Sequence, residues 1–224
     1  MKNKKFVLAS LIATLAISAP VSADWTKAAS LLGGNKSETA QSGAFGAQDA
    51  LVSKFLSSAS LINEAQLTVA KSLKLDEVVA KHGAENQAKK GMSVEQLTEE
   101  NTALGQSLAE ALTKASQDGL KLDEESKKLY LEALVQYASG LVETKGVVDT
   151  APNFISSAKD TIASASLTEK LTVTGKLEDG MYIAKEIPSY AKSIWETSQL
   201  MLSFAKSNEI EVPADATAAI NTVF

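Results

Sequence analysis

Cysteine and arginine are both missing from the 224-residue sequence, and histidine occurs once, at His82. Without cysteine the chain forms no disulfide, has no thiolate nucleophile and cannot carry the lipid of a bacterial lipoprotein. A single histidine without cysteine also excludes a zinc site of the usual nitrogen and sulfur kind. We therefore expect no metal and no cofactor, and a fold that is stable without cross-links.

Positive charge is scarce and of one kind. All 22 basic residues are lysines, and 27 acidic residues outnumber them. The first 23 residues hold three of the lysines and no acid, so their removal changes the formal net charge from −5 to −8. Arginine, the side chain that binds phosphate and guanine in bidentate fashion, is not available. We expect no nucleic-acid partner, and the net charge disfavours adsorption to anionic lipid.

The N-terminus has the three parts of a secretory signal peptide. Lysines within the first five residues precede an apolar run at 6–18, and Val21-Ser22-Ala23 offers small residues to signal peptidase. The run is shorter than the roughly 20 residues of a membrane-spanning helix. We predict a signal peptide at 1–23, a mature chain that begins at Asp24 without an integral span, and export. The leader resembles those of gram-negative bacterial proteins, so the destination is the periplasm or the outside of the cell.

Two regions follow the leader. Residues 24–48 combine a short helix with a stretch rich in Gly, Ser and amides, which predicts a flexible linker. Residues 49–224 are dominated by apolar residues at three-to-four spacing, which predicts a single helical domain. We expect an all-α antiparallel bundle of four to five main amphipathic helices with a flexible N-terminal arm.

The first half of the domain gives three segments. The apolar stripe from Leu51 to Leu73 predicts a helix of about seven turns. A short polar segment at 76–91 predicts one or two fraying turns. Ser93 and Gln96 have the spacing of a capping box and begin a second long helix, which we expect to end at Gly119.

The second half is less uniform. A third long helix is predicted from Asp123 to Lys145 with a stop at Gly146, and Pro152 is placed near the start of a shorter one. Residues 167–187 are ambiguous between helix and a short strand at Leu171-Thr-Val-Thr. A last long helix is predicted from Pro188 to about Ser207, followed by a small-residue tail that lies against the body or frays.

No local motif for catalysis is present. His82 lies in a polar segment that we expect to be exposed, without a neighbouring carboxylate or serine that would make it a base. The acidic pairs do not follow the ligand pattern of a calcium loop. Most of them lie at predicted helix starts, where the exposed amides and the helix dipole favour negative charge.

Aromatic residues supply the weak candidates for ligand or partner binding. Five aromatic residues could line a groove between the third and the last long helix, although aromatics at helical spacing also form cores: Tyr130, Tyr137, Tyr182, Tyr190 and Trp195. Trp25, isolated before the linker, is expected to dock on the body or on a partner.

Three functions remain open. The first is an exported, non-enzymatic helical bundle that binds a protein partner or a small apolar ligand. The alternatives are a membrane-active or lipid-binding amphipathic protein, and an enzyme whose residues leave no local motif. The oligomeric state is left open.

The pentapeptide LKLDE occurs twice, at 73–77 and at 120–124. Similarity does not extend beyond it, so no repeat architecture follows. Both copies lie between helices, and we predict that Asp76 and Asp123 are N-caps.

Overall fold

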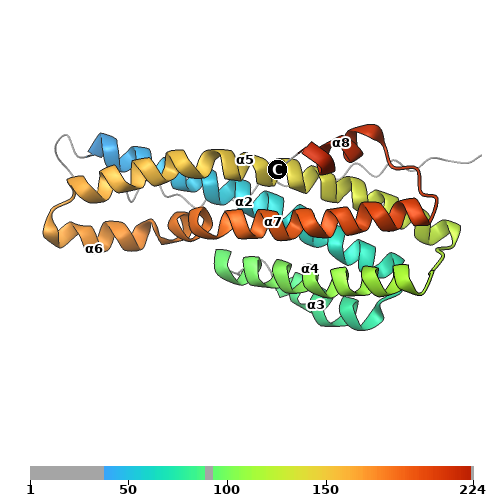
Figure 1. Ribbon diagram of the computed structural model, residues 1–224. Coiled ribbons are helices and arrows are strands. Elements are labelled where there is room, and N and C mark those ends of the chain that lie inside the picture. The colour runs from blue at the N-terminus through green and yellow to red at the C-terminus, as the bar shows by residue number, and fades with distance from the viewer. Residues whose placement is uncertain (1–37, 89–92, 223–224) are drawn as a thin grey trace, which may run out of the picture. The chain divides into compact units, whose positions relative to one another are not determined.

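The computed structural model describes residues 38–88 and 93–222, and every regular element in these ranges is a helix (Figure 1). The predicted all-α class is confirmed. The predicted signal peptide, the segment 24–37 and Trp25 lie outside the described residues. The helices are α2 (Glu38–Ser72), α3 (Asp76–Ala88), α4 (Val94–Gln117), α5 (Glu124–Ser164), α6 (Leu167–Lys176), α7 (Glu178–Ser207) and α8 (Ala214–Thr222).

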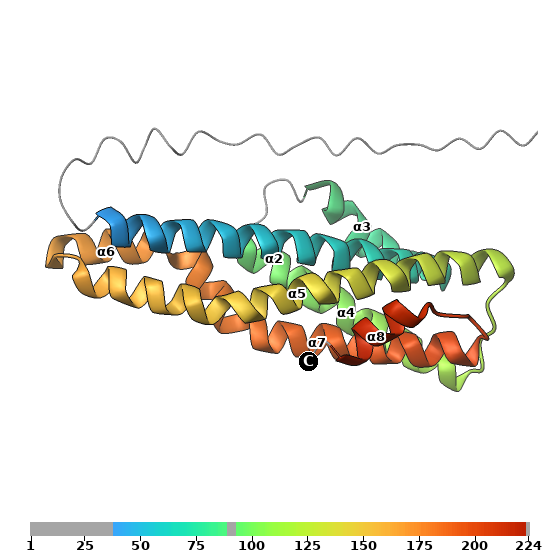
Figure 2. The same ribbon diagram turned by 90° about the horizontal axis from the view of Figure 1, so that it is seen from above.

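Four long helices, α2, α4, α5 and α7, form the bundle, and α5 runs against the other three (Figures 1 and 2). Gln136 Nε2 on α5 donates to Glu64 Oε2 on α2 over 3.0 Å. Just past the end of α2, Lys74 Nζ lies 3.0 Å from Asp123 Oδ2, which immediately precedes α5. Residue numbers rise along α2 in the direction in which they fall along α5, so these two helices are antiparallel, as predicted.

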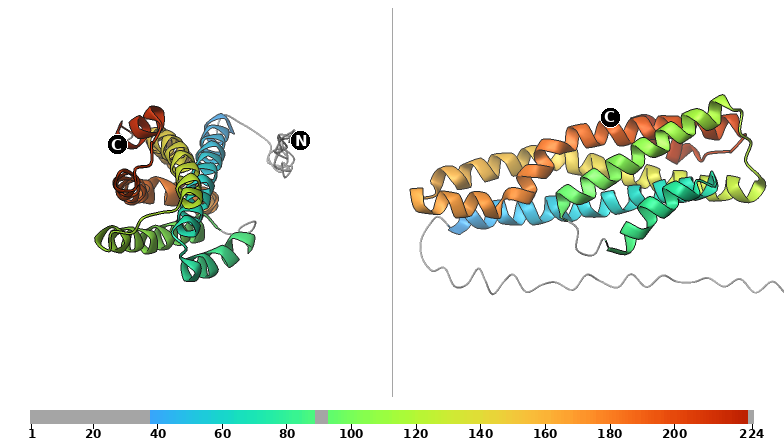
Figure 3. Two further views of the ribbon diagram at one scale, coloured as in Figure 1. Left: turned by 90° about the vertical axis from the view of Figure 1, so that its right-hand side faces the viewer. Right: turned by 90° about the horizontal axis from the view of Figure 1, so that it is seen from below.

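Helix α4, like α7, runs parallel to α2. Asn63 Nδ2 donates to Asn101 Oδ1 over 2.6 Å, and Gln66 packs on Gly105. The short helix α3 carries the chain back between α2 and α4, which allows the parallel return (Figure 3). The capping box predicted at the start of α4 is confirmed, since Ser93 Oγ accepts from Gln96 N and Ser93 N donates to Gln96 Oε1.

Helix α2 begins earlier than expected. Residues 38–48, which we had assigned to a flexible linker, are helical. Ala44 is buried in the core, and Gln48 Nε2 donates to Lys176 O over 2.8 Å while its Oε1 accepts from Gly180 N over 3.1 Å. These contacts with distant helices stabilise a segment whose composition alone favours a loop.

The predicted stop at Gly146 is wrong, because α5 continues to Ser164. Pro152, which we placed near the start of a separate helix, lies inside α5. Val147, Ala151 and Phe154 on either side are buried, so packing offsets the helix-breaking cost of about 3 kcal/mol for an interior proline.

The ambiguous stretch 167–187 is helical and contains no strand. Leu177 alone separates α6 from α7, so the last long helix begins ten residues before the predicted Pro188. The tail also forms a helix, α8, whose Ala216 and Ile220 are buried.

The two LKLDE copies form different turns. In the first, Lys74 takes a left-handed φ of 56° and Leu75 N donates to Ala70 O over 2.9 Å. At the second copy the left-handed residue is Gly119, which has a φ of 66° and immediately precedes the pentapeptide. Asp123 is then a true N-cap, since its Oδ1 accepts from Ser126 N over 2.8 Å. The N-cap prediction is confirmed there and is wrong for Asp76, which is the first residue of α3.

Candidate functional site

Two of the predicted binding residues, Tyr130 and Tyr137, are fully buried between α5 and α7. The Tyr130 hydroxyl donates to Met201 O and the Tyr137 hydroxyl donates to Ile194 O, each over 2.9 Å. Burial raises the pKa of both phenols above the usual value of 10. These neutral hydroxyls tie α5 to the backbone of α7 and face no open surface.

Tyr190 is also part of the core. It is 3% exposed, and its ring packs on Phe55 with 5.6 Å between the ring centroids. Its hydroxyl accepts a hydrogen bond from Asn101 Nδ2 over 3.1 Å, and burial raises its pKa. The structure therefore brings the three tyrosines into the interior, where they line no groove.

Trp195 is different, because it is only partly buried and forms one end of a surface groove between α5 and α7. The groove has a volume of about 370 Å³, within the range of small-molecule sites. Its lining is almost wholly apolar. We call it the Trp195 groove, and its walls are Val148, Pro188, Ala191, Lys192 and Trp195.

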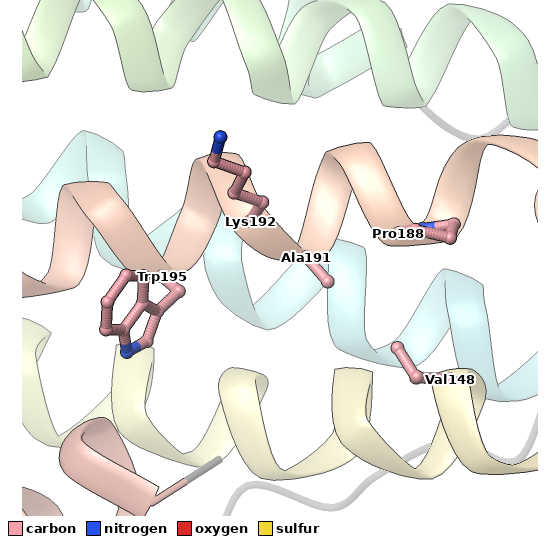
Figure 4. A pocket seen from close by; sticks show the side chains of 5 residues that line it. All are labelled: Val148, Pro188, Ala191, Lys192 and Trp195. Carbon is pink, nitrogen blue, oxygen red and sulfur yellow. The ribbon is translucent and has the colours of Figure 1, made fainter. Parts of the chain in front are cut away.

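The lining side chains have distinct orientations (Figure 4). Val148 on α5 points towards Ala191 on α7, and Pro188 closes the end opposite Trp195. Lys192 extends away from Val148, and its ammonium lies 3.8 Å from Glu196 with most of the side chain in solvent. The interior of the groove is thus hydrocarbon, and the Lys192 ammonium points away from it, beside Glu196.

Proline and alanine explain why there is space at this level. Pro188 and Pro152 have no N–H, so the carbonyls of Ala184 and Val148 lose the usual helical hydrogen bond. Ala191 presents only a methyl group towards α5.

Helix α8 ends beside the groove. Trp195 Nε1 donates to Ile220 O over 3.1 Å, and Gln199 Nε2 donates to the same oxygen over 3.3 Å. Ile220 itself is fully buried. This hydrogen bond orients the indole against the end of α8.

His82 is buried at 2% exposure, contrary to the expected exposed position. Its Nδ1 lies 2.6 Å from Glu100 Oε1, which brings α3 onto α4. Its Nε2 is buried, and no hydrogen-bond partner for it lies within residues 38–88 and 93–222. The pair has the residue types of a base and its orienting carboxylate, but a buried Nε2 cannot reach a substrate.

The acidic pairs do not gather into a metal site. Within residues 38–88 and 93–222, no group of three His, Asp or Glu residues is arranged to hold a metal ion. Most pairs lie in the first turns of helices, as predicted: Asp76 and Glu77 in α3, Glu124 and Glu125 in α5, and Glu178 and Asp179 in α7. Among these same described helices, none has both the length and the hydrophobicity that crossing a membrane requires.

Sequence reasoning identified Trp195 but missed the other four walls of the groove. Pro152 and Pro188 could have indicated the groove, because a proline inside a packed helix removes a backbone hydrogen bond. The sequence pattern instead predicts a helix start near each of them. No protein family, no curated protein and no solved structure matches the chain.

Proposed function

We propose that the protein is an exported, non-enzymatic binding protein that holds a small apolar ligand in the Trp195 groove. The observation that carries this proposal is the apolar hollow of about 370 Å³ beside a fixed indole. Burial of hydrocarbon against such a surface contributes roughly 25 cal/mol per Å² of apolar area removed from water. Export is supported by the leader, with its lysines, apolar run and small residues before Asp24.

The ligand is a small molecule in this proposal because the groove is short and open. A volume of about 370 Å³ fits a compact apolar molecule, and a protein partner could insert no more than one or two side chains.

The test uses N-phenyl-1-naphthylamine, an apolar fluorescent probe, in a Trp25→Phe background in which Trp195 is the remaining tryptophan. We expect the probe fluorescence to rise and the Trp195 emission to fall as the groove fills. Val148→Glu places a charge on the groove floor and should weaken probe binding by about tenfold or more.

Val142→Glu is the matched control, because Val142 lies on the same helix, is 54% exposed and is not part of the groove. It should bind the probe as the parent does. Absence of binding by the parent chain, or equal binding by Val148→Glu, would contradict the proposal.

A further inference from the structure

Helix α8 is the shortest of the described helices, with nine residues. Isolated helices below about 12–15 residues are marginal in water, so α8 depends on its contact with the bundle. The chain reverses after α7, and α8 lies back along α5 and α7 (Figures 1 and 2). Ala216 and Ile220, four residues apart on one face, are 5% and 0% exposed. Docking of α8 therefore rests on a small apolar area.

The polar part of this contact is made by Trp195 and Gln199. The indole N–H of Trp195 donates to Ile220 O over 3.1 Å, and Gln199, one turn further along α7, donates to the same oxygen over 3.3 Å. The last four carbonyls of a helix have no partner inside it, and Ile220 is the third residue from the end of α8. A partly buried indole N–H in turn needs an acceptor. Helix α8 and the indole therefore satisfy each other, and neither hydrogen bond survives if α8 leaves the bundle.

The same indole is a wall of the Trp195 groove, at the end opposite Pro188 (Figure 4). Trp195 thus belongs to two contacts at once, because its N–H is bound to α8 while its ring lines the groove. Without the acceptor at Ile220, the indole N–H would turn to water, and the side chain could leave the position in which it forms the wall. The shape of the groove therefore depends on whether α8 is docked.

We propose that α8 is a strap that controls ligand binding in the Trp195 groove. The inference rests on the proposed function, because the regulated site is the same groove. Docked α8 holds the indole as a wall of the groove, and a ligand that packs on the indole favours docked α8. Coupling of this kind is reciprocal, because each event changes the free energy of the other by the same amount. A short helix held by two buried side chains and two hydrogen bonds is an element of low local stability, which such a coupling can shift.

The first measurement needs no ligand. In the Trp25→Phe background, Ile220→Ser should undock α8, because it removes the fully buried side chain that anchors the helix. We expect acrylamide to quench Trp195 emission more strongly, and the amides of α8 to exchange hydrogen faster, than in the parent chain. Gln199→Ala removes one of the two donors to Ile220 O and should shift both readouts in the same direction by less.

The second measurement uses N-phenyl-1-naphthylamine as the ligand. The probe should slow hydrogen exchange in α8 of the parent chain, and Ile220→Ser should weaken probe binding by about fivefold or more. Val173→Ser is the matched control, because it also removes a buried branched side chain from a short helix, α6, and Val173 is not part of the groove. It should leave Trp195 quenching and probe binding as they are in the parent. Circular dichroism establishes that each variant is folded.

The outcomes separate the strap from the groove. Probe binding by the parent together with equal binding by Ile220→Ser would overturn the inference and leave the proposed function standing. Tighter binding by Ile220→Ser would also overturn it, because α8 would then cover apolar surface that the ligand uses. Unchanged Trp195 quenching alongside faster exchange in α8 would show that the indole does not depend on the strap. Absence of probe binding by the parent contradicts the proposed function itself, and the strap then has no site to control.

Discussion

Gly180 shows how one residue without a side chain determines the packing of two helices. A Cβ placed on Gly180 would lie 2.5 Å from Phe154 Cζ, and Phe154 is 1% exposed. The ring therefore lies directly on the backbone of α7, and it anchors the part of α5 that continues beyond Pro152. Gly146, in contrast, has open space where its Cβ would be.

We expect Gly180→Ala to destabilise the protein by about 1–3 kcal/mol, because the buried ring cannot move aside without disturbing its neighbours. Gly146→Ala is the control and should stabilise the protein by about 0.5–1 kcal/mol, because alanine favours an intact helix at that position. Urea denaturation of both variants measures the difference. Loss of stability in Gly146→Ala would mean that α5 does not continue through this position.

At the scale of the elements, the two LKLDE copies show that identical letters do not imply identical roles. Lys74 of the first copy is itself the left-handed residue that ends α2, whereas Gly119 supplies that conformation before the second copy. Because the left-handed residue lies inside the first copy but before the second, Asp76 falls in the first turn of its helix and Asp123 falls at the N-cap. The two copies also meet, since Lys74 Nζ lies 3.0 Å from Asp123 Oδ2.

Asp123→Ala should lower the melting temperature more than Asp76→Ala, because only Asp123 accepts the capping hydrogen bond. The backbone N–H of Ser126, and then Lys74, lower the pKa of Asp123 from 3.8 to about 2. A depressed pKa stabilises the fold above pH 4, and this contribution is lost as the pH falls towards 2. Thermal melts across pH 2–7 should show the gap between wild type and Asp123→Ala shrinking in that window. Equal effects of the two substitutions near neutral pH would contradict the assignment.

Helix starts that have a local cap were predicted correctly, whereas the starts of α2 and α7 and the end of α5 were not. The capping box at Ser93 and the cap at Asp123 are local hydrogen-bond patterns, so the sequence could place them. The continuation of α5 past Gly146 and Pro152 depends on Phe154 packing against Gly180, a contact between residues that are 26 positions apart. No local pattern contains that information.

At the scale of the whole molecule, a buried polar layer joins the helices. Asn101 on α4 donates to Ala59 O over 2.8 Å and to the Tyr190 hydroxyl over 3.1 Å, and accepts from Asn63 over 2.6 Å. Gln66, also fully buried, lies beside Tyr137, and neither of its amide atoms has a hydrogen-bond partner in the part of the chain that the structure describes. The Asn101 amide is therefore fully hydrogen-bonded, whereas the Gln66 amide is not.

Asn101→Leu should therefore destabilise the protein by about 2–4 kcal/mol, because three hydrogen bonds between helices are lost. Gln66→Met keeps the shape and removes two unpaired polar atoms, so it should stabilise the protein by about 1 kcal/mol or more. Chemical denaturation compares the two. A loss of stability in Gln66→Met similar to that in Asn101→Leu would show that the Gln66 amide is paired in solution.

Export is tested by the N-terminus of the protein isolated from the periplasm or the medium. Because Val21-Ser22-Ala23 is the small-residue site after the apolar run, we expect Asp24 as the first residue. N-terminal sequencing or intact mass measures this. A cell-associated chain that keeps residues 1–23 would contradict the prediction.

The sequence by itself determined the all-α class, the positions of several helix starts and the absence of cysteine, because these follow from residue type and local spacing. It could also predict that Tyr130, Tyr137 and Tyr190 share the α5–α7 side. Only the tertiary structure decided that these tyrosines are core, that Trp195 faces a groove with Val148, and that Leu167 and Leu171 remain exposed. The physical reason is that burial depends on which helix lies opposite, and helical periodicity describes one face of a helix without naming its partner.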